Sequence, residues 1–211
     1  MLLFVEEIVR IQNILLDCNN EFRVLGCSLG DLIGNTGKKH LWDKREKSQI
    51  DVIVLHYISA AATCPLSPYD LGAILKIFCD YGVSSHFLID RQGVVFRLVP
   101  EAEKAWHCGG SLMPAPDLRI NVNEFSIGIE LMATAQSGFT DLQYDSAVRL
   151  SLFLEQHFNV EFSYVGHDTI AGPEAVELGL RKELKVDPGS LFDWNLFRNN
   201  LSVLRSSIFA D

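Results

Sequence analysis

A continuous run of apolar residues from Val52 to Leu55 restricts the fold of this chain more than any other feature. A run without polar alternation is typical of a strand buried on both faces, as in α/β proteins whose sheet is covered by helices. The run is followed at once by His56. Because ligands of α/β folds gather at strand ends, the sequence predicts a functional side chain at this point.

Three helices are predicted. The first has Ser67 as its N-cap, and an apolar stripe at helical spacing follows it. The second begins at a capping box formed by Thr140 and Gln143 and runs to about residue 157. The third covers residues 195–204.

Strands are predicted between these helices. Residues 87–89 and 94–96 flank a polar turn and form a hairpin, residues 126–131 alternate between apolar and small or polar side chains, and residues 162–166 form a short strand. The pattern predicts an α/β fold: a single domain with a central mixed β-sheet flanked by helices, plus an N-terminal extension.

Residues 50–211 are predicted to form this domain, and residues 1–49 an N-terminal helix with an irregular lead-in. Phe4, Ile8, Ile11 and Leu15 have helical spacing, and the stretch from about 25 to 49 is rich in glycine and charge.

Composition excludes some classes of function. The formal net charge is −9, with 27 acidic and 18 basic residues, so no basic surface for nucleic acid is expected. No segment reaches the roughly 18 to 20 apolar residues needed to span a bilayer. The N-terminus lacks the pattern of a secretory signal, and the five cysteines are odd in number and scattered. We therefore expect reduced thiols in a cytoplasmic protein.

Two further residues, His167 and Asp187, are potential metal ligands like His56. His167 directly follows the short strand 162–166. Asp187 lies in a segment whose backbone Pro188 favours as extended. Two imidazoles and one carboxylate form a catalytic zinc set with a fourth position left for water. The alternative is that each histidine is an ordinary polar residue with a hydrogen-bond partner.

Glu130 is the candidate general base. On its predicted strand it shares one face with Gly128, while the apolar residues face the other way. Such a carboxylate is either a solvent-facing residue or a base beside an activated water.

The other histidines are assigned differently. His40 and His157 are predicted to be structural, and His86 to be structural or to support the site. His107 precedes Cys108, which raises the alternative of a thiol nucleophile. Adjacent residues of an extended chain point to opposite faces, which argues against a Cys–His dyad.

Seven short motifs occur together along residues 51–204. They are residues 54–56 (VLH), 84–89 (SSHFLI), 90–93 (DRQG), 105–109 (AWHCG), 123–130 (NEFSIGIE), 166–167 (GH) and 185–189 (KVDPG). In this order the series resembles the N-acetylmuramoyl-L-alanine amidases of the phage T7 lysozyme and peptidoglycan-recognition-protein type (amidase family 2). Within that family the resemblance is greatest to the cytoplasmic anhydro-muropeptide amidases of cell-wall recycling.

The resemblance implies one zinc ion per chain, held by His56, His167 and Asp187. Glu130 matches the carboxylate that activates water, and Lys185 matches the lysine that stabilises the oxyanion. The positions that match the substrate groove are Trp106, His107 and Asn123.

The chain departs from the family pattern at two places. Residues 171–183 form an insertion between the second and third ligands, and it supplies Arg181 and Lys182 as rivals for the role of Lys185. Gly82 stands where the recycling branch has an arginine for a diaminopimelate carboxylate.

The predicted function is zinc-dependent hydrolysis of the amide bond between the lactyl group of muramic or anhydro-muramic acid and L-alanine, with a muropeptide as substrate. Two other classes of function stay open at this stage. A non-catalytic module would bind cell-wall fragments without turnover, and an α/β interaction domain would bind no metal.

Overall fold

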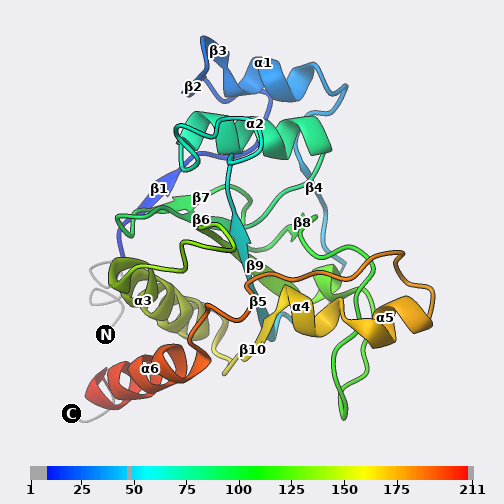
Figure 1. The fold of residues 1–211 in the computed structure, drawn as a ribbon, viewed down its shortest axis with the longest axis vertical. Coiled ribbons are helices and arrows are strands. Elements are labelled where there is room, and N and C mark those ends of the chain that lie inside the picture. The colour runs from blue at the N-terminus through cyan, green and yellow to red at the C-terminus, as the bar shows by residue number, and fades with distance from the viewer. Residues whose placement is uncertain (1–8, 47–48, 209–211) are drawn as a thin grey trace.

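The computed structural model describes residues 9–46 and 49–208 and has a mixed six-stranded sheet at its centre (Figure 1). Across the sheet the order is β1 (Ile11–Asn13), β7 (Val95–Arg97), β6 (Phe87–Ile89), β9 (Ser126–Met132), β5 (Val52–Ile58) and β10 (Ser163–Gly166). The neighbouring strands pair in parallel, except for the antiparallel hairpin of β6 and β7.

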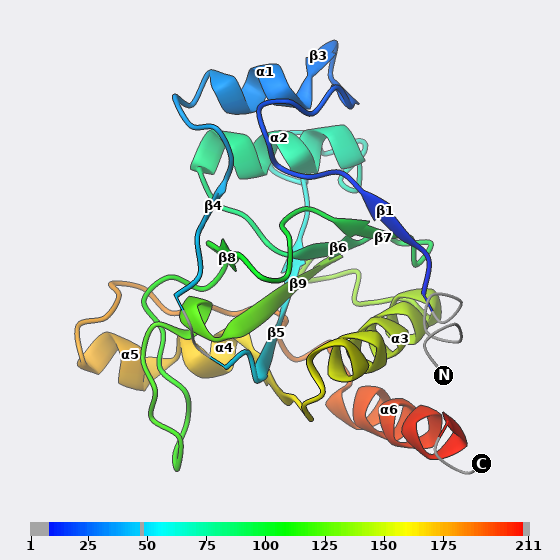
Figure 2. The same ribbon diagram turned by 180° about the vertical axis from the view of Figure 1, so that it is seen from behind.

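Helices cover both faces of the sheet. Helices α3 (Asp141–Phe158) and α6 (Trp194–Ile208) lie side by side on one face, and α1 (Leu29–Gly34) lies over α2 (Leu71–Tyr81) on the other (Figures 1 and 2). The short elements are β2 (Arg23–Val24), β3 (Cys27–Ser28), β4 (Trp42–Asp43), β8 (Lys104–Ala105), η2 (Val122–Glu124), α4 (His167–Ile170) and α5 (Pro173–Glu177). The predicted α/β fold class is therefore confirmed.

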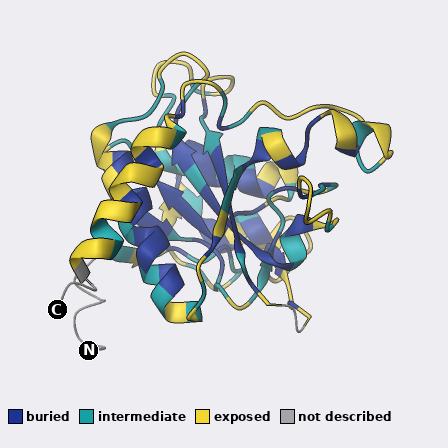
Figure 3. Cartoon of the chain, turned by 90° about the horizontal axis from the view of Figure 1, so that it is seen from below, coloured by how far each residue is buried: buried dark blue, intermediate teal, exposed yellow. Residues whose placement is uncertain are grey.

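Strand β5 is buried on both faces, as its apolar run predicts. Ile53 and Leu55 pack into the core beneath α3 and α6, while Val52 and Val54 pack into a smaller cluster on the opposite face. Figure 3 shows the buried residues concentrated in the sheet and on the inward sides of the helices. Because side chains alternate along a strand, His56 lies on the same face as Val52 and Val54.

Several predicted elements are confirmed, and some of their boundaries differ. The hairpin, the strand at 126–132 and the capping box of Thr140 and Gln143 are all present. The first helix begins at Leu71 with Asp70 as its N-cap, rather than with Ser67, because the Ser67 carbonyl accepts from Asp70 in a turn before the helix. Strand β5 continues to Ile58, two residues beyond His56.

The prediction of a helix through Ile11 and Leu15 is wrong for the described residues, since Ile11–Asn13 form β1. This segment pairs with the open edge of β7, with Ile11 opposite Val95, so sheet pairing outweighs the helical spacing. Phe4 and Ile8 lie outside the described residues.

The lead-in is more ordered than its composition indicates. Ser28 and Asp31 form a capping box at the start of α1, and Leu29 and Ile33 are buried in the same hydrophobic cluster as residues of α2. Arg45 is buried, and its guanidinium donates to the carbonyl oxygens of Asn123 (2.7 Å), Glu103 (2.7 Å) and Ser126 (3.0 Å). The described part of the extension therefore packs as one body with the domain.

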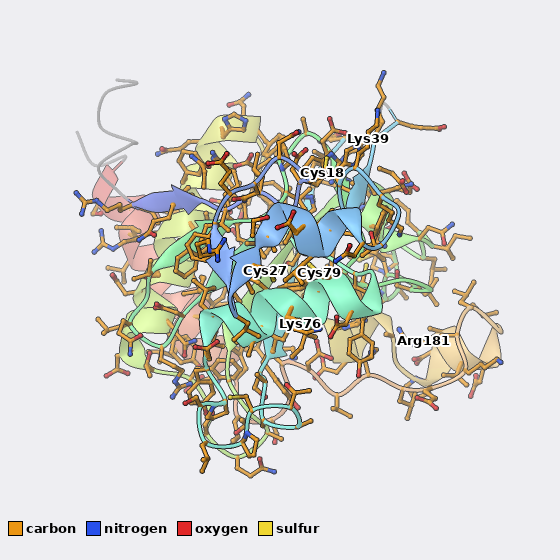
Figure 4. The ribbon with its side chains drawn as sticks, turned by 90° about the horizontal axis from the view of Figure 1, so that it is seen from above. Cys18, Cys27, Lys39, Lys76, Cys79 and Arg181 are labelled. Carbon is orange, nitrogen blue, oxygen red and sulfur yellow. The ribbon has the colours of Figure 1, made fainter. Side chains whose placement is uncertain are left out.

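All five cysteines are free thiols. Figure 4 shows Cys27 and Cys79 where α1 and α2 approach each other, with Cys18 nearby and Arg181 on the distant insertion.

Within residues 9–46 and 49–208, no helix combines the length and apolar character needed to cross a membrane.

Candidate active site

Strand register brings His56 and Glu130 together. The two residues are direct partners in the parallel pairing of β5 and β9. Neighbouring strands lie about 4.8 Å apart, so the two side chains leave the same face of the sheet as neighbours. His167 arrives from the other side of β5, because it directly follows β10, which also pairs with β5.

The three predicted ligands converge on one point. The Nδ1 atom of His56 lies 2.9 Å from Asp187 Oδ2 and 3.1 Å from His167 Nδ1. The Nδ1 atom of His167 lies 3.1 Å from the same oxygen of Asp187. Among the described residues, these three form the group of histidine, cysteine and carboxylate side chains able to hold a metal ion.

The chemistry and spacing of this donor set fit zinc. Zn–N and Zn–O bonds of about 2.0 to 2.2 Å in a tetrahedral site place neighbouring donor atoms roughly 3.3 Å apart, close to the separations found here. Three protein ligands are the number that a catalytic zinc site uses, and they leave one position open. His56 and His167 are both buried, so the site is held by the core.

The backbone explains how Asp187 reaches the site across a long insertion. The N–H of Asp168 donates to the carbonyl of Asp187 (2.7 Å), and the N–H of Lys185 donates to the carbonyl of Ala171 (3.2 Å). These hydrogen bonds join the two ends of the insertion beside the site, and the residues between them form a loop.

Burial and hydrogen bonding set the charge of the donor set. Burial lowers the pKa of His167 to about 4, so this imidazole is neutral at pH 7. Burial opposes ionisation of Asp187, but hydrogen bonds from His167 and His56 outweigh it and hold the pKa of Asp187 below its usual range. For His56, burial lowers the pKa, while Asp187 and Glu130 raise it by more.

Glu130 occupies an unusual environment for a carboxylate. Burial raises its pKa to about 7, and its Oε2 atom is buried without a hydrogen-bond partner among the described residues. A carboxyl group that titrates near neutral pH is suited to accept and return a proton.

The side chain of Lys185 is exposed, and its charge acts on the pKa of Glu130, His56 and His167. Arg181 is engaged elsewhere, since it donates to the carbonyl oxygens of Gly110 (3.2 Å) and Glu183 (2.5 Å). Lys182 is exposed on the insertion.

The three residues predicted to line the substrate groove already have protein partners. Trp106 Nε1 donates to Asp43 (2.9 Å), and Asn123 Oδ1 accepts from the backbone N–H of Cys108 (3.0 Å). His107 Nδ1 lies 3.0 Å from His56 Nε2. Their assignment to substrate contacts stays a prediction.

The structure argues against the thiol alternative. Cys108 is buried and its thiol donates to Asn123 Oδ1 (2.9 Å). Burial raises the pKa of Cys108 to about 12, so the reactive thiolate is suppressed.

Two residues near the site were missed by sequence reasoning. Ser126 Oγ lies 3.2 Å from His107 Nε2. Its position two and four residues before Gly128 and Glu130 places it on the same face of β9, a signal that the alternating pattern already contained. Arg45 sits in a charged run, and nothing local distinguishes it from its solvated neighbours.

A family model described as N-acetylmuramoyl-L-alanine amidase matches residues 46–190. The chain belongs to this amidase family. The prediction that the protein is an enzyme of this class is thereby confirmed.

The chain is also similar to individual amidases in sequence and in structure. The chain is 33% identical over 147 residues to the 1,6-anhydro-N-acetylmuramyl-L-alanine amidase AmpD of Enterobacter cloacae, covering 69% of this chain and 71% of that protein. It matches the crystal structure of a selenomethionine derivative of AmpD with a TM-score of 0.61 at 30% identity, covering 75% of this chain and 88% of the other. The AmiD amidase of Escherichia coli, solved with anhydro-N-acetylmuramic acid-L-Ala-D-γ-Glu-L-Lys, matches with a TM-score of 0.50 at 25% identity, covering 73% and 59% of the two chains.

Proposed function

We propose that this amidase uses zinc to hydrolyse the amide bond between the lactyl group of an anhydro-muramoyl or muramoyl unit and L-alanine. The observation that carries the proposal is the convergence of His56, His167 and Asp187 on one point, with the buried carboxyl of Glu130 as the strand partner of His56. The similarity to AmpD and to AmiD supports an anhydro-muropeptide as the substrate.

His56, His167 and Asp187 would hold the zinc ion. Zinc with three protein ligands supplies a Lewis acid that polarises a carbonyl and lowers the pKa of water to about 7. The protein then has to move protons and stabilise charge. Glu130 is proposed to accept a proton from the attacking water at Oε2 and to deliver it to the departing L-alanine amine.

Lys185 is proposed to hold negative charge on the lactyl carbonyl oxygen as the tetrahedral intermediate forms. Its influence on the pKa of Glu130 supports a position close to the reacting atoms. A donor aimed at a developing oxyanion contributes about 10² to 10³ to kcat.

Trp106 and Asn123 are candidates to line the substrate groove, and residues 50–211 are proposed to form the amidase domain, which includes most of the stretch matched by the family model. A cytoplasmic location is proposed because all five cysteines are free thiols, which is typical of a reducing compartment.

Two substitutions test the proposal together. We expect Asp187→Ala to lose both bound zinc and release of the stem peptide from an anhydro-muropeptide, because two imidazoles alone hold the ion poorly. Glu130→Gln is expected to keep zinc while turnover falls by about 10² to 10⁴, because the amide cannot accept the proton. Zinc content and peptide release are measured on the same samples.

Asp145→Ala, on the exposed side of α3, is the matched control and should retain both properties. Full turnover by Asp187→Ala would contradict the ligand assignment. Binding of the muropeptide by wild-type protein without any release of peptide would favour a non-catalytic recognition module instead.

A further inference from the structure

His107 occupies the space behind one metal ligand. Its Nδ1 atom lies 3.0 Å from His56 Nε2, and its Nε2 atom lies 3.2 Å from Ser126 Oγ. The rings of His56 and His107 are nearly perpendicular, with an interplanar angle of 88°. The three side chains therefore form a hydrogen-bonded row that begins at the metal site and ends in the buried hydroxyl of β9.

The protons in this row can be placed by chemistry alone. The Nδ1 atom of His56 faces Asp187 and His167, so in the zinc-bound protein it must carry a lone pair in place of the hydrogen that it donates to Asp187 in the metal-free protein. A neutral His56 then carries its hydrogen on Nε2 and donates it to His107 Nδ1. His107 in turn must carry its hydrogen on Nε2 and donate it to Ser126 Oγ.

The absence of a side chain at Gly128 leaves the space that the His107 ring occupies. A Cβ atom placed on Gly128 would lie 2.6 Å from Cγ of His107, a distance that forces the ring to move. Ser126, Gly128 and Glu130 alternate along β9 and so share one face. Along this face Ser126 provides the hydrogen-bond acceptor, Gly128 the space for the His107 ring and Glu130 the candidate base.

The two ligand histidines are supported unequally. Nε2 of His167 is buried and has no hydrogen-bond partner among the described residues, whereas the corresponding atom of His56 has His107. The orientation of His56 therefore has a dedicated partner, and that partner does not itself join the metal group.

We propose that His107 is a positioning residue, which accepts from His56 Nε2–H and so fixes the tautomer and ring plane in which Nδ1 of His56 binds zinc. This assignment rests on the proposed zinc site, and it gives His107 a role other than contact with substrate. Partners of this kind behind a metal ligand are typically worth about 10- to 100-fold in metal affinity.

A matched pair of substitutions isolates the hydrogen bond. Asn at position 107 carries an acceptor oxygen close to the place of Nδ1, whereas Leu has a similar branched shape and no acceptor. Zinc affinity is measured on metal-depleted protein by competition with a chromophoric chelator, and circular dichroism checks that each variant is folded. We expect His107→Leu to bind zinc about 10- to 100-fold more weakly and His107→Asn to stay close to wild type.

Ser126→Ala provides a second variant that touches no metal ligand. It removes only the far hydrogen bond of the row, so we expect a loss of about threefold, comparable to one net hydrogen bond. Equal zinc affinity for wild type, His107→Leu and His107→Asn would overturn the inference while leaving the proposed function intact. A wild-type protein that binds no zinc would overturn the metal site, and the inference with it.

A spectroscopic signature separates positioning from general structural support. In the zinc-loaded protein, ¹⁵N NMR of the imidazoles should show His56 and His107 both protonated at Nε2. His107 protonated at Nδ1 could not accept from His56, and that result would also overturn the inference.

Discussion

At the scale of single residues, the site depends on how burial divides the ionisable groups. Burial leaves His167 neutral and raises the pKa of Glu130 to about 7, whereas Asp187 stays ionised because two imidazoles hydrogen-bond to it. One carboxylate is thereby committed to holding charge and the other is free to exchange a proton. The same functional group, a carboxyl, differs in its protonation between the two positions because its surroundings differ.

The proposed oxyanion-stabilising role of Lys185 can be tested by exchanging two lysines of the same loop. We expect Lys185→Ala to lower kcat by about 10² to 10³ with little change in zinc content, because its charge lies near Glu130. Lys182→Ala is the matched control at an exposed position and should leave kcat unchanged. Steady-state kinetics on a muropeptide measures both, and the opposite ranking would transfer the role to Lys182.

Protonation of His86 should make the stability of the protein depend on pH, whether or not metal is bound. Burial and the nearby Arg45 guanidinium lower the pKa of His86 to about 3, while its Nδ1 accepts from the N–H of Gly128 (2.9 Å). The unfolded chain therefore binds the extra proton between about pH 6.5 and 3. The stability contributed by neutral His86 is complete above about pH 6.5 and is lost as the pH falls, by about 1.4 kcal/mol per unit.

Urea unfolding of metal-depleted protein tests the contribution of His86 to the pH dependence of stability. His86→Asn keeps an acceptor for Gly128 but does not titrate, so its free energy of unfolding should fall less between pH 6.5 and 5 than that of wild type. His157→Asn, at an exposed position of α3, controls for the loss of a histidine from the unfolded chain. Parallel pH profiles for wild type and His86→Asn would contradict the assignment.

At the scale of elements, the sheet register and the hydrogen-bonded ends of the insertion determine the geometry of the proposed ligands. The pairing of β5 with β9 and β10 brings His56, Glu130 and His167 together. Hydrogen bonds from Asp168 to Asp187 and from Lys185 to Ala171 then bring back the third ligand. We therefore expect the site to be insensitive to the length of chain between Ala171 and Lys185.

Shortening the insertion tests that independence. We expect replacement of residues 173–183 by a short glycine-containing turn to leave zinc affinity within about threefold of wild type, since each doubling of loop length changes the closure free energy by only about 0.6 kcal/mol. Loss of zinc from a shortened protein with unchanged circular dichroism would show that the insertion itself shapes the site. A change in KM alone would indicate that the insertion contacts substrate.

At the scale of the whole molecule, local patterns predicted the central sheet and its helices, because continuous or alternating apolar runs determine burial directly. The edge strand β1 was not predicted, since pairing with β7 depends on an open edge that is distant in sequence. Arg45 was missed for a similar reason, because all its carbonyl partners lie at least 58 residues away. The residues of the proposed metal site were predicted from strand ends and family motifs, but the hydrogen bonds that hold Asp187 and His107 required the fold.

The proposed function requires zinc, held by the side chains of this amidase, for cleavage of the muramoyl–L-alanine bond. Chromatography of the stem peptide that purified protein releases from an anhydro-N-acetylmuramyl peptide tests this requirement, before metal depletion, after it, and after one equivalent of zinc per chain is restored. We predict that release is abolished by depletion and recovered with zinc. Release that continues unchanged in protein shown to be free of metal would overturn the proposed zinc dependence.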